Sequence, residues 1–443
     1  MKIFASFLAV SIFVAGASAA AAADHWVGAW GYDVSPEPPG TIGETLSPHN
    51  AKLAVLLPMG MAPAPEPVPD YSKYRPVILN PGHLEFLSNA TPLSGITVRQ
   101  LVRVSVGGSQ IRLRFTNEPG SDVLPLGVVH VAEADADGAI VPGTDHAVTF
   151  DGHPTVVIPA SSPMLSDPVN MTVRPLEKLL ISVVIPGELP HNGRAILMYA
   201  TQTTGDYTAA IHLPDAKLAF ISTLVSEVDV NAARPTKVLV TFGDSITEGI
   251  TSTMNAFHGW PAFLAARLAA AHKNWSVVNA GISGNRLVRY GAGPSALSRF
   301  DRDVLSVPGV KAVILMEGIN DIGLSYSPEY ARDPVTAQTL EDADKQIIAR
   351  AHERGIKVYG ALLTPYQGAD YASAAGEKVR EELNNWIKTG GAFDGVLDFA
   401  TPVADPANPL AILPKYNIAD HLHPNDAGYK AMADSIDLDL ITK

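Results

Sequence analysis

Two patterns of apolar and polar residues divide the chain. Between residues 98 and 200, short runs that alternate apolar and polar side chains are separated by Gly, Pro and Asp. A period of two is typical of β-strands that bury one face. After Pro235, strand-like apolar runs alternate with amphipathic helical stretches, which is the pattern of a parallel sheet covered by helices. We therefore expect an all-β sandwich over 24–232, followed by an α/β domain over 233–443.

In the first part, the runs 98–106 and 111–115 lie on either side of Gly107 and Gly108, which predicts a β-hairpin. A short edge strand is expected between Trp26 and Trp30. The proline-rich stretch 58–81 should form a surface loop. Further strands are predicted near 127–132, 146–150, 154–158, 179–185 and 195–200.

In the second part, predicted strands and helices alternate along the chain. The buried runs are short and β-branched, and the helical runs carry apolar residues on one face. Strands are predicted at 237–242, 275–279, 312–316, 356–363 and 396–399, and helices at 261–271, 340–354, 377–388 and 425–436.

Length and composition narrow the classes of protein. A chain of 443 residues exceeds one ordinary domain. It opens with Met1-Lys2, an apolar run and small alanine-rich residues. This pattern predicts a secretory signal peptide over 1–23 and a secreted or periplasmic protein. No later apolar run is long enough to predict a membrane span.

Charge and cysteine content exclude several partners. The formal net charge is −13, from 32 basic and 45 acidic residues, and no basic stripe offsets it. Nucleic acid and anionic membranes are therefore not expected as partners. The chain has no cysteine, so disulfides and thiol-ligated metals are excluded.

Candidate chemistry lies in four short segments: VLVTFGDSITEG at 238–249, GISGNR at 281–286, MEGIND at 316–321 and ADHLHPND at 419–426. Ser245 follows a strand at a turn, where α/β folds hold reactive groups. His423 is the candidate base, because Asp420 three residues earlier can accept from one imidazole nitrogen while the other faces Ser245. His421, adjacent to the acid, is the competing candidate.

In this order the segments resemble the four signature blocks of the SGNH (GDSL-type) hydrolase family, over residues 233–443. The resemblance implies a three-layer α/β/α, flavodoxin-like fold. It also implies a catalytic triad of Ser245, Asp420 and His423, without metal or cofactor. The oxyanion hole would consist of the Ser245 N–H, the Gly284 N–H and the Asn320 side-chain amide.

The expected activity is that of a secreted serine esterase for short-chain acyl esters, acetyl esters above all, on small molecules or polysaccharides. Two alternative functions are not excluded by the sequence: an acyltransferase that uses the same triad, and a glycan-binding protein with a vestigial hydrolase domain. A metal site built from Asp420, His421, His423 and Asp426 is disfavoured, because the spacing matches no zinc signature. Whether the β-domain binds glycan is equally open.

Overall fold

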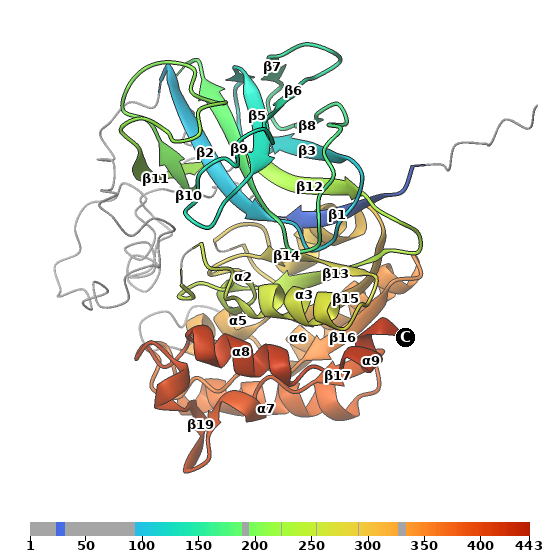
Figure 1. Cartoon of the computed structure of the whole chain (residues 1–443). Coiled ribbons are helices and arrows are strands. Elements are labelled where there is room, and N and C mark those ends of the chain that lie inside the picture. Colours follow the sequence, from blue (N-terminus) through green and yellow to red (C-terminus); the bar gives the residue numbers. More distant parts are fainter. Residues whose placement is uncertain are drawn as a thin grey trace, which may run out of the picture.

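The computed structural model describes residues 24–31, 94–187, 195–222, 224–253, 255–290, 292–326 and 334–443. The predicted signal peptide and the proline-rich stretch 58–81 lie outside the described residues. Within them, an antiparallel β part precedes an α/β part (Figure 1). This arrangement confirms the predicted fold class.

The β part is built from two antiparallel sheets with strand orders β1-β12-β3-β8 and β11-β10-β2-β9-β5-β6, and β4 pairs with β7. In β3, Ile111, Leu113 and Phe115 are buried, while Arg112 and Arg114 between them are partly exposed, which is the expected period of two. The strands are β1 (Trp26–Gly31), β2 (Ile96–Arg103), β3 (Ile111–Thr116), β4 (Leu124–Leu126), β5 (Val129–Glu133), β6 (His146–Val148), β7 (Val156–Ile158), β8 (Pro163–Leu165), β9 (Lys178–Ile185), β10 (Ala195–Ala200), β11 (Lys217–Ser222) and β12 (Val225–Asn231).

The hairpin predicted around Gly107 and Gly108 is wrong, because β2 and β3 belong to different sheets. The connection passes from one sheet to the other instead of turning back. The Gly108 N–H donates to the Val173 carbonyl at 3.0 Å. A Cβ on Gly108 would lie 2.4 Å from the Asn231 carbonyl oxygen. These glycines therefore serve a close backbone crossing, which local alternation does not distinguish from a turn.

The α/β part contains a five-stranded parallel sheet with the order β14-β13-β15-β16-β17. The chain starts at β13, moves to the edge strand β14 and then crosses to β15 on the other side of β13. In such sheets, ligands bind at the carboxyl ends of the strands where the winding reverses. The strands are β13 (Lys237–Gly243), β14 (Trp275–Gly281), β15 (Val310–Met316), β16 (Lys357–Ala361) and β17 (Gly395–Leu397).

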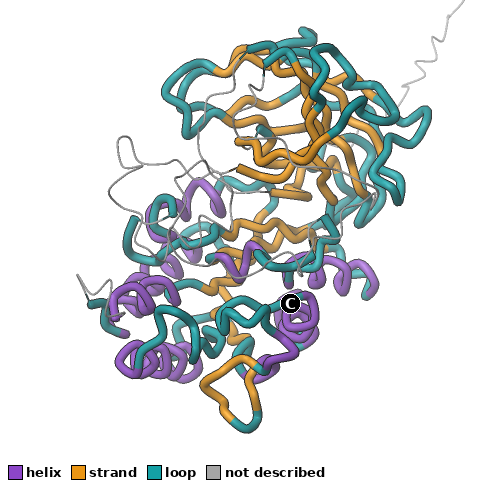
Figure 2. Tube along the Cα trace, turned by 90° about the vertical axis from the view of Figure 1, so that its left-hand side faces the viewer, coloured by secondary structure: helices purple, strands orange, loops and turns teal. Residues whose placement is uncertain are grey.

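Helices flank this sheet (Figure 2). Helix α3 packs against β14 and α8, and α6 packs against β16 and α7. No helix of the described part is both long and apolar enough to cross a membrane. The helices are α2 (Ser245–Glu248), α3 (Trp260–Ala270), α4 (Ala296–Phe300), the π-helix η2 (Asp301–Leu305), α5 (Ile319–Tyr326), α6 (Ala337–His352), α7 (Ala374–Thr389), the 3₁₀ turns η3 (Thr401–Val403) and η4 (Pro414–Tyr416), α8 (Asp426–Asp434) and α9 (Leu438–Thr442), and a small antiparallel pair joins β18 (Ala404–Asp405) to β19 (Asn408–Ile412).

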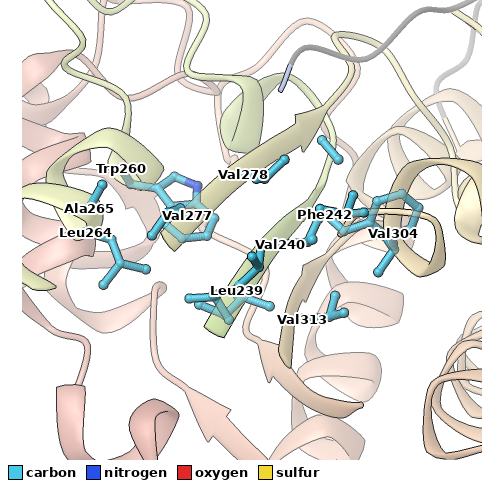
Figure 3. Packing of buried hydrophobic residues seen from close by; sticks show 14 of the residues in the cluster. Leu239, Val240, Phe242, Trp260, Leu264, Ala265, Val277, Val278, Val304 and Val313 are labelled. Carbon is cyan, nitrogen blue, oxygen red and sulfur yellow. The ribbon is translucent and has the colours of Figure 1, made fainter. Parts of the chain in front are cut away.

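Strand β13 lies in the middle of the core. Leu239, Val240 and Phe242 are fully buried, with Trp260 and Leu264 of α3 packed nearby (Figure 3). A strand covered on both faces needs apolar residues at nearly every position. This explains why β13 is apolar except for Lys237 at its start and Thr241, whose hydroxyl donates to the Val278 carbonyl at 3.4 Å. The buried strand gives the candidate nucleophile a rigid support.

The two parts share a buried contact where β1 lies against the edge strand β14. The Ser276 hydroxyl donates to the Gly28 carbonyl at 2.6 Å, and the Gly28 N–H donates to the Pro308 carbonyl at 2.9 Å. One apolar cluster runs through both parts, from Val27 to Ile441. The division at 232/233 stays a prediction, but the two parts are joined by a common core.

Candidate active site

Ser245 begins helix α2 directly after β13. Asp244 caps this helix: its Oδ1 accepts the Ile246 N–H at 2.9 Å. Gly243 before it cannot carry a side chain, because a Cβ there would lie 2.3 Å from the Met316 carbonyl oxygen. The strand thus ends in a tight turn that presents Ser245 at the carboxyl edge of the sheet. Asp244 therefore organises this turn through its side chain.

His423 bridges Ser245 and Asp420. Its Nε2 lies 2.9 Å from the Ser245 Oγ, and its Nδ1 lies 2.6 Å from the Asp420 Oδ2. Ser245 is 4% exposed and His423 is 2% exposed, so little water competes for these bonds. If the carboxylate accepts the Nδ1–H, the Nε2 is left as the acceptor for the serine hydroxyl.

Asp420 is held as a carboxylate by its own loop. Burial favours its neutral form and raises its pKa, but the His423 imidazole and the Leu422 and His423 N–H groups outweigh burial. The net pKa of Asp420 is lowered. Its Oδ1 accepts those two N–H groups at 3.0 and 2.9 Å. The loop thus fixes the acid and the imidazole relative to each other.

The competing histidine, His421, is exposed and has a φ of 61°. Its ring lies against Gly368, where a Cβ would come within 2.9 Å of the ring. In the described part of the chain, no hydrogen bond joins His421 to Asp420. The structure therefore brings Ser245, Asp420 and His423 together and leaves His421 outside.

The Gly284 backbone has a φ of 74°, in the left-handed region that favours glycine. The Ser283 N–H before it donates to Glu248 Oε2 of α2 at 2.7 Å. The segment that contains Gly284 is thereby attached to the helix that begins at Ser245. This is consistent with the close backbone approach expected of an oxyanion donor.

Asn320 lies at the start of α5, after β15. Its Nδ2 donates to the Asn285 carbonyl at 2.9 Å, and its Oδ1 accepts the Tyr371 hydroxyl at 3.2 Å. The two bonds fix which side of the amide carries the N–H groups. The second Nδ2 hydrogen is not used in these two bonds and can donate to a substrate oxygen.

Tyr371 was not anticipated from the sequence. It is fully buried, and its ring lies against Gly323 of α5, where a Cβ would come within 2.1 Å of the ring. Only a glycine one helical turn after Asn320 leaves room for this ring. A glycine in a helix was the available signal, but it did not identify the tyrosine.

Arg299, on α4, is a second residue that the sequence did not reveal. Its guanidinium donates to the Gly243 carbonyl, the Ala280 carbonyl and the Asn285 Oδ1, each at 2.9 Å. Its Cζ lies 4.1 Å from the centroid of the Phe242 ring. One buried cation therefore ties the strand before Ser245 to the segment before Asn285, whose carbonyl holds Asn320.

Arg299 pairs with Asp303 at 3.1 Å, and three further acids of this region, Asp244, Glu317 and Asp321, are buried. Burial raises the pKa of Asp244 to about 7, against the opposing effects of the Ile246 N–H and His423. Burial also raises the pKa of Asp321 to about 6, and that of Glu317 well above its usual value. Asp321 lies on α5 and accepts the Leu287 and Val288 N–H groups.

Trp260 is fully buried and packs on Phe399 with ring centroids 4.9 Å apart. It belongs to the core. Asp426, weighed above as a metal ligand, binds the Thr253 N–H and His258 at 2.7 and 2.6 Å. Within the described residues, no three His, Asp or Glu side chains are grouped as a metal ion would require.

Residues 241–431 match the model of the GDSL-like Lipase/Acylhydrolase family. No curated protein matches the chain. Among solved structures, a protein assigned to the lipolytic G-D-S-L family from Desulfitobacterium hafniense is 27% identical, covers 45% of this chain and 97% of its own, and has a TM-score of 0.35. An acetyl xylan esterase from Geobacillus stearothermophilus is 18% identical, covers 45% and 92% of the two chains, and has a TM-score of 0.36. The matched residues include the segments of Ser245, Gly284, Asn320 and His423. The chain therefore contains a domain of the GDSL-like lipase/acylhydrolase family, and this domain is a hydrolase.

Proposed function

We propose that this chain is an exported serine esterase that hydrolyses short-chain acyl esters, acetyl esters above all, on small molecules or polysaccharides. The observation that carries the proposal is the bonded series Ser245 Oγ, His423 Nε2, His423 Nδ1 and Asp420 Oδ2, with separations of 2.9 and 2.6 Å. The family match supports ester hydrolysis. Export rests on the signal-peptide pattern of residues 1–23.

In the proposed mechanism, the Ser245 Oγ attacks the carbonyl carbon while its proton passes to the His423 Nε2. The resulting imidazolium lies against the ionised Asp420, whose lowered pKa keeps it negative. The tetrahedral oxyanion takes hydrogen bonds from the Ser245 N–H, the Gly284 N–H and the Asn320 amide. One such donor is worth about 3 kcal/mol of transition-state stabilisation.

Collapse of this intermediate expels the alcohol, which takes the proton from His423. The acyl group stays on the Ser245 Oγ. Water then attacks the acyl-enzyme, His423 again accepts and returns a proton, and the acid leaves. A sugar hydroxyl in place of water would give acyl transfer by the same steps.

The test is a panel of nitrophenyl esters of increasing acyl length beside acetylated xylan, with Ser245→Ala as the comparison. The variant is expected to lose about four or more orders of magnitude in kcat with an unchanged circular dichroism spectrum. An organophosphonate should label Ser245. Label on another serine, or full activity in the variant, would refute the proposal. Product analysis with an added alcohol separates hydrolysis from transfer.

A further inference from the structure

The segment between α2 and α3 connects the base to the β part. We call residues 251–253 and 255–258 the bridging loop. On one side, the Thr251 hydroxyl donates to the Pro424 carbonyl at 2.8 Å, and the Thr253 N–H donates to Asp426 at 2.7 Å. Both partners closely follow His423 in the chain. On the other side, the Asn255 amide donates to the Tyr199 hydroxyl of β10 at 3.3 Å.

Two cations of the β part share one aromatic ring of the bridging loop. The Arg103 Cζ lies 4.8 Å from the centroid of the Phe257 ring, and the Lys178 Nζ lies 5.7 Å from it. Arg103 ends β2, Lys178 begins β9, and they are directly opposite each other across the antiparallel pair. Arg103 also donates to the Ala262 carbonyl of α3 at 2.9 Å.

This pair is electrostatically unfavourable as it stands. Like charges directly opposite each other on neighbouring strands destabilise a sheet. Burial lowers the pKa of Arg103 to about 10, and burial followed by the Arg103 charge lowers the pKa of Lys178. Among the residues that the structure describes, neither side chain has a carboxylate within ion-pair distance.

The contrast with other arginines of the β part is informative. Arg112 pairs with Asp229 at 2.7 Å, and Arg114 pairs with Glu227 at 2.8 Å. The chain has 45 acidic residues to supply such partners.

Within the described part of the chain, Arg99 of β2 also has no ion pair, but its guanidinium donates to four backbone carbonyls. Arg103 and Lys178 differ from these arginines because they are two adjacent, half-buried cations without an acid among the described residues, an arrangement that a bound anion would stabilise.

We propose that Arg103, Lys178 and Phe257 form a subsite for a carboxylate of the substrate. The substrate class would be acyl esters of acidic, uronate-containing glycans. The guanidinium and ammonium groups would both donate to the carboxylate, relieving their mutual repulsion.

The inference rests on the proposed esterase function. The bridging loop that contains Phe257 also contacts Pro424 and Asp426, which follow His423 in the chain. The sugar bound at this subsite would be an acidic residue of the same glycan, separate from the acylated sugar at Ser245.

The first experiment compares kcat/KM for an acetylated oligosaccharide that contains glucuronic acid with that for the matching oligosaccharide in which glucose replaces the glucuronic acid. In the full chain, Lys178→Gln and Arg103→Gln should each lower this acidic-to-neutral ratio about 5- to 10-fold. Arg103→Lys, which keeps the charge, should retain most of it. Added salt should lower the wild-type ratio.

The matched control is Lys237→Gln. Its Nζ lies 5.2 Å from the Trp275 ring centroid, which makes the same type of contact. Lys237 begins β13, at the opposite end of the strand from Ser245. The ratio should stay within about 2-fold of the wild type in this control. An unchanged ratio in Lys178→Gln and in folded Arg103→Gln would overturn the proposal and leave the pair as a clamp on the bridging loop.

A binding measurement separates this inference from the proposed function. The catalytically inactive variant Ser245→Ala is mixed with methyl glucuronide, methyl glucoside or inorganic phosphate at increasing concentration. Its Tm is measured at each concentration. Only the glucuronide should raise Tm, and it should fail to do so once Lys178→Gln is added. A larger shift with phosphate would overturn the carboxylate assignment. If wild type hydrolyses neither ester while the glucuronide shift appears, the esterase function fails and the subsite is supported.

Discussion

Replacing Tyr371 by Phe tests whether the orientation of the Asn320 amide matters for catalysis. The change removes one hydroxyl, which donates to the Asn320 Oδ1 at 3.2 Å, and leaves the ring against Gly323. A neutral hydrogen bond contributes about 1 kcal/mol, which corresponds to about 5-fold in rate. Complete loss of an oxyanion donor costs about 10²- to 10³-fold. We therefore expect kcat to fall between about 5- and 100-fold.

The assay is steady-state hydrolysis of nitrophenyl acetate. KM should change little, because the amide is proposed to bind the transition state more strongly than the ground state. The Asn320 Oδ1 is left buried without its donor, so urea unfolding should also show a loss of about 1–3 kcal/mol. The control is Tyr366→Phe, on the neighbouring ring 6.0 Å away, which should keep kcat.

A double variant provides the refutation. If Tyr371 acts through Asn320, Asn320→Ala with Tyr371→Phe should be no slower than Asn320→Ala alone. Independent, multiplying losses would show that the tyrosine acts elsewhere. An unchanged kcat in Tyr371→Phe would show that the Asn285 bond is enough to orient the amide.

Three further predictions concern the remaining site groups. His423→Ala should lose nearly as much kcat as Ser245→Ala, while His421→Ala keeps most activity; the reverse outcome in ester hydrolysis would reassign the base. Because the pKa of Asp420 is lowered in the folded state, its ionisation stabilises the fold fully above the unfolded-state pKa of about 4, and the effect is lost as pH falls through the lower folded value. The stability gap between wild type and Asp420→Asn in urea should therefore shrink with acidification below about pH 4, and a gap that widens would contradict the shift. Exhaustive EDTA treatment should leave hydrolysis intact because the proposed proton transfers use protein groups alone, and loss with recovery on added Zn²⁺ would contradict this.

The element types of the α/β part followed from local pattern. Strands buried on both faces must be mostly apolar, as β13 is, and helices that cover a sheet must be amphipathic. The relation between Asp420 and His423 was also local, because a pair three residues apart on a tight loop can meet without help from the rest of the chain. The four motif blocks identified the remaining candidates by their residue types and order.

Other features depend on residues far apart in sequence. The donor Tyr371 lies 51 residues from Asn320, and Arg299 lies 56 residues from Gly243. Neither stands in a motif, because their roles are defined by partners that only folding brings near. The crossing at Gly107 and Gly108 was misread for the same reason: the backbone that crowds Gly108 belongs to Val173 and Asn231.

Sequence by itself thus determined the fold class and the chemical groups at the carboxyl edge of the sheet. Periodicity and spacing record which side chains must be buried and which can meet within one loop. Only the tertiary structure decided how Arg299 and Tyr371 hold those groups, and that Arg103 and Lys178 face each other over Phe257. The physical reason is that hydrogen bonds and charge pairs between separate elements depend on register and packing, which leave no periodic trace along the chain.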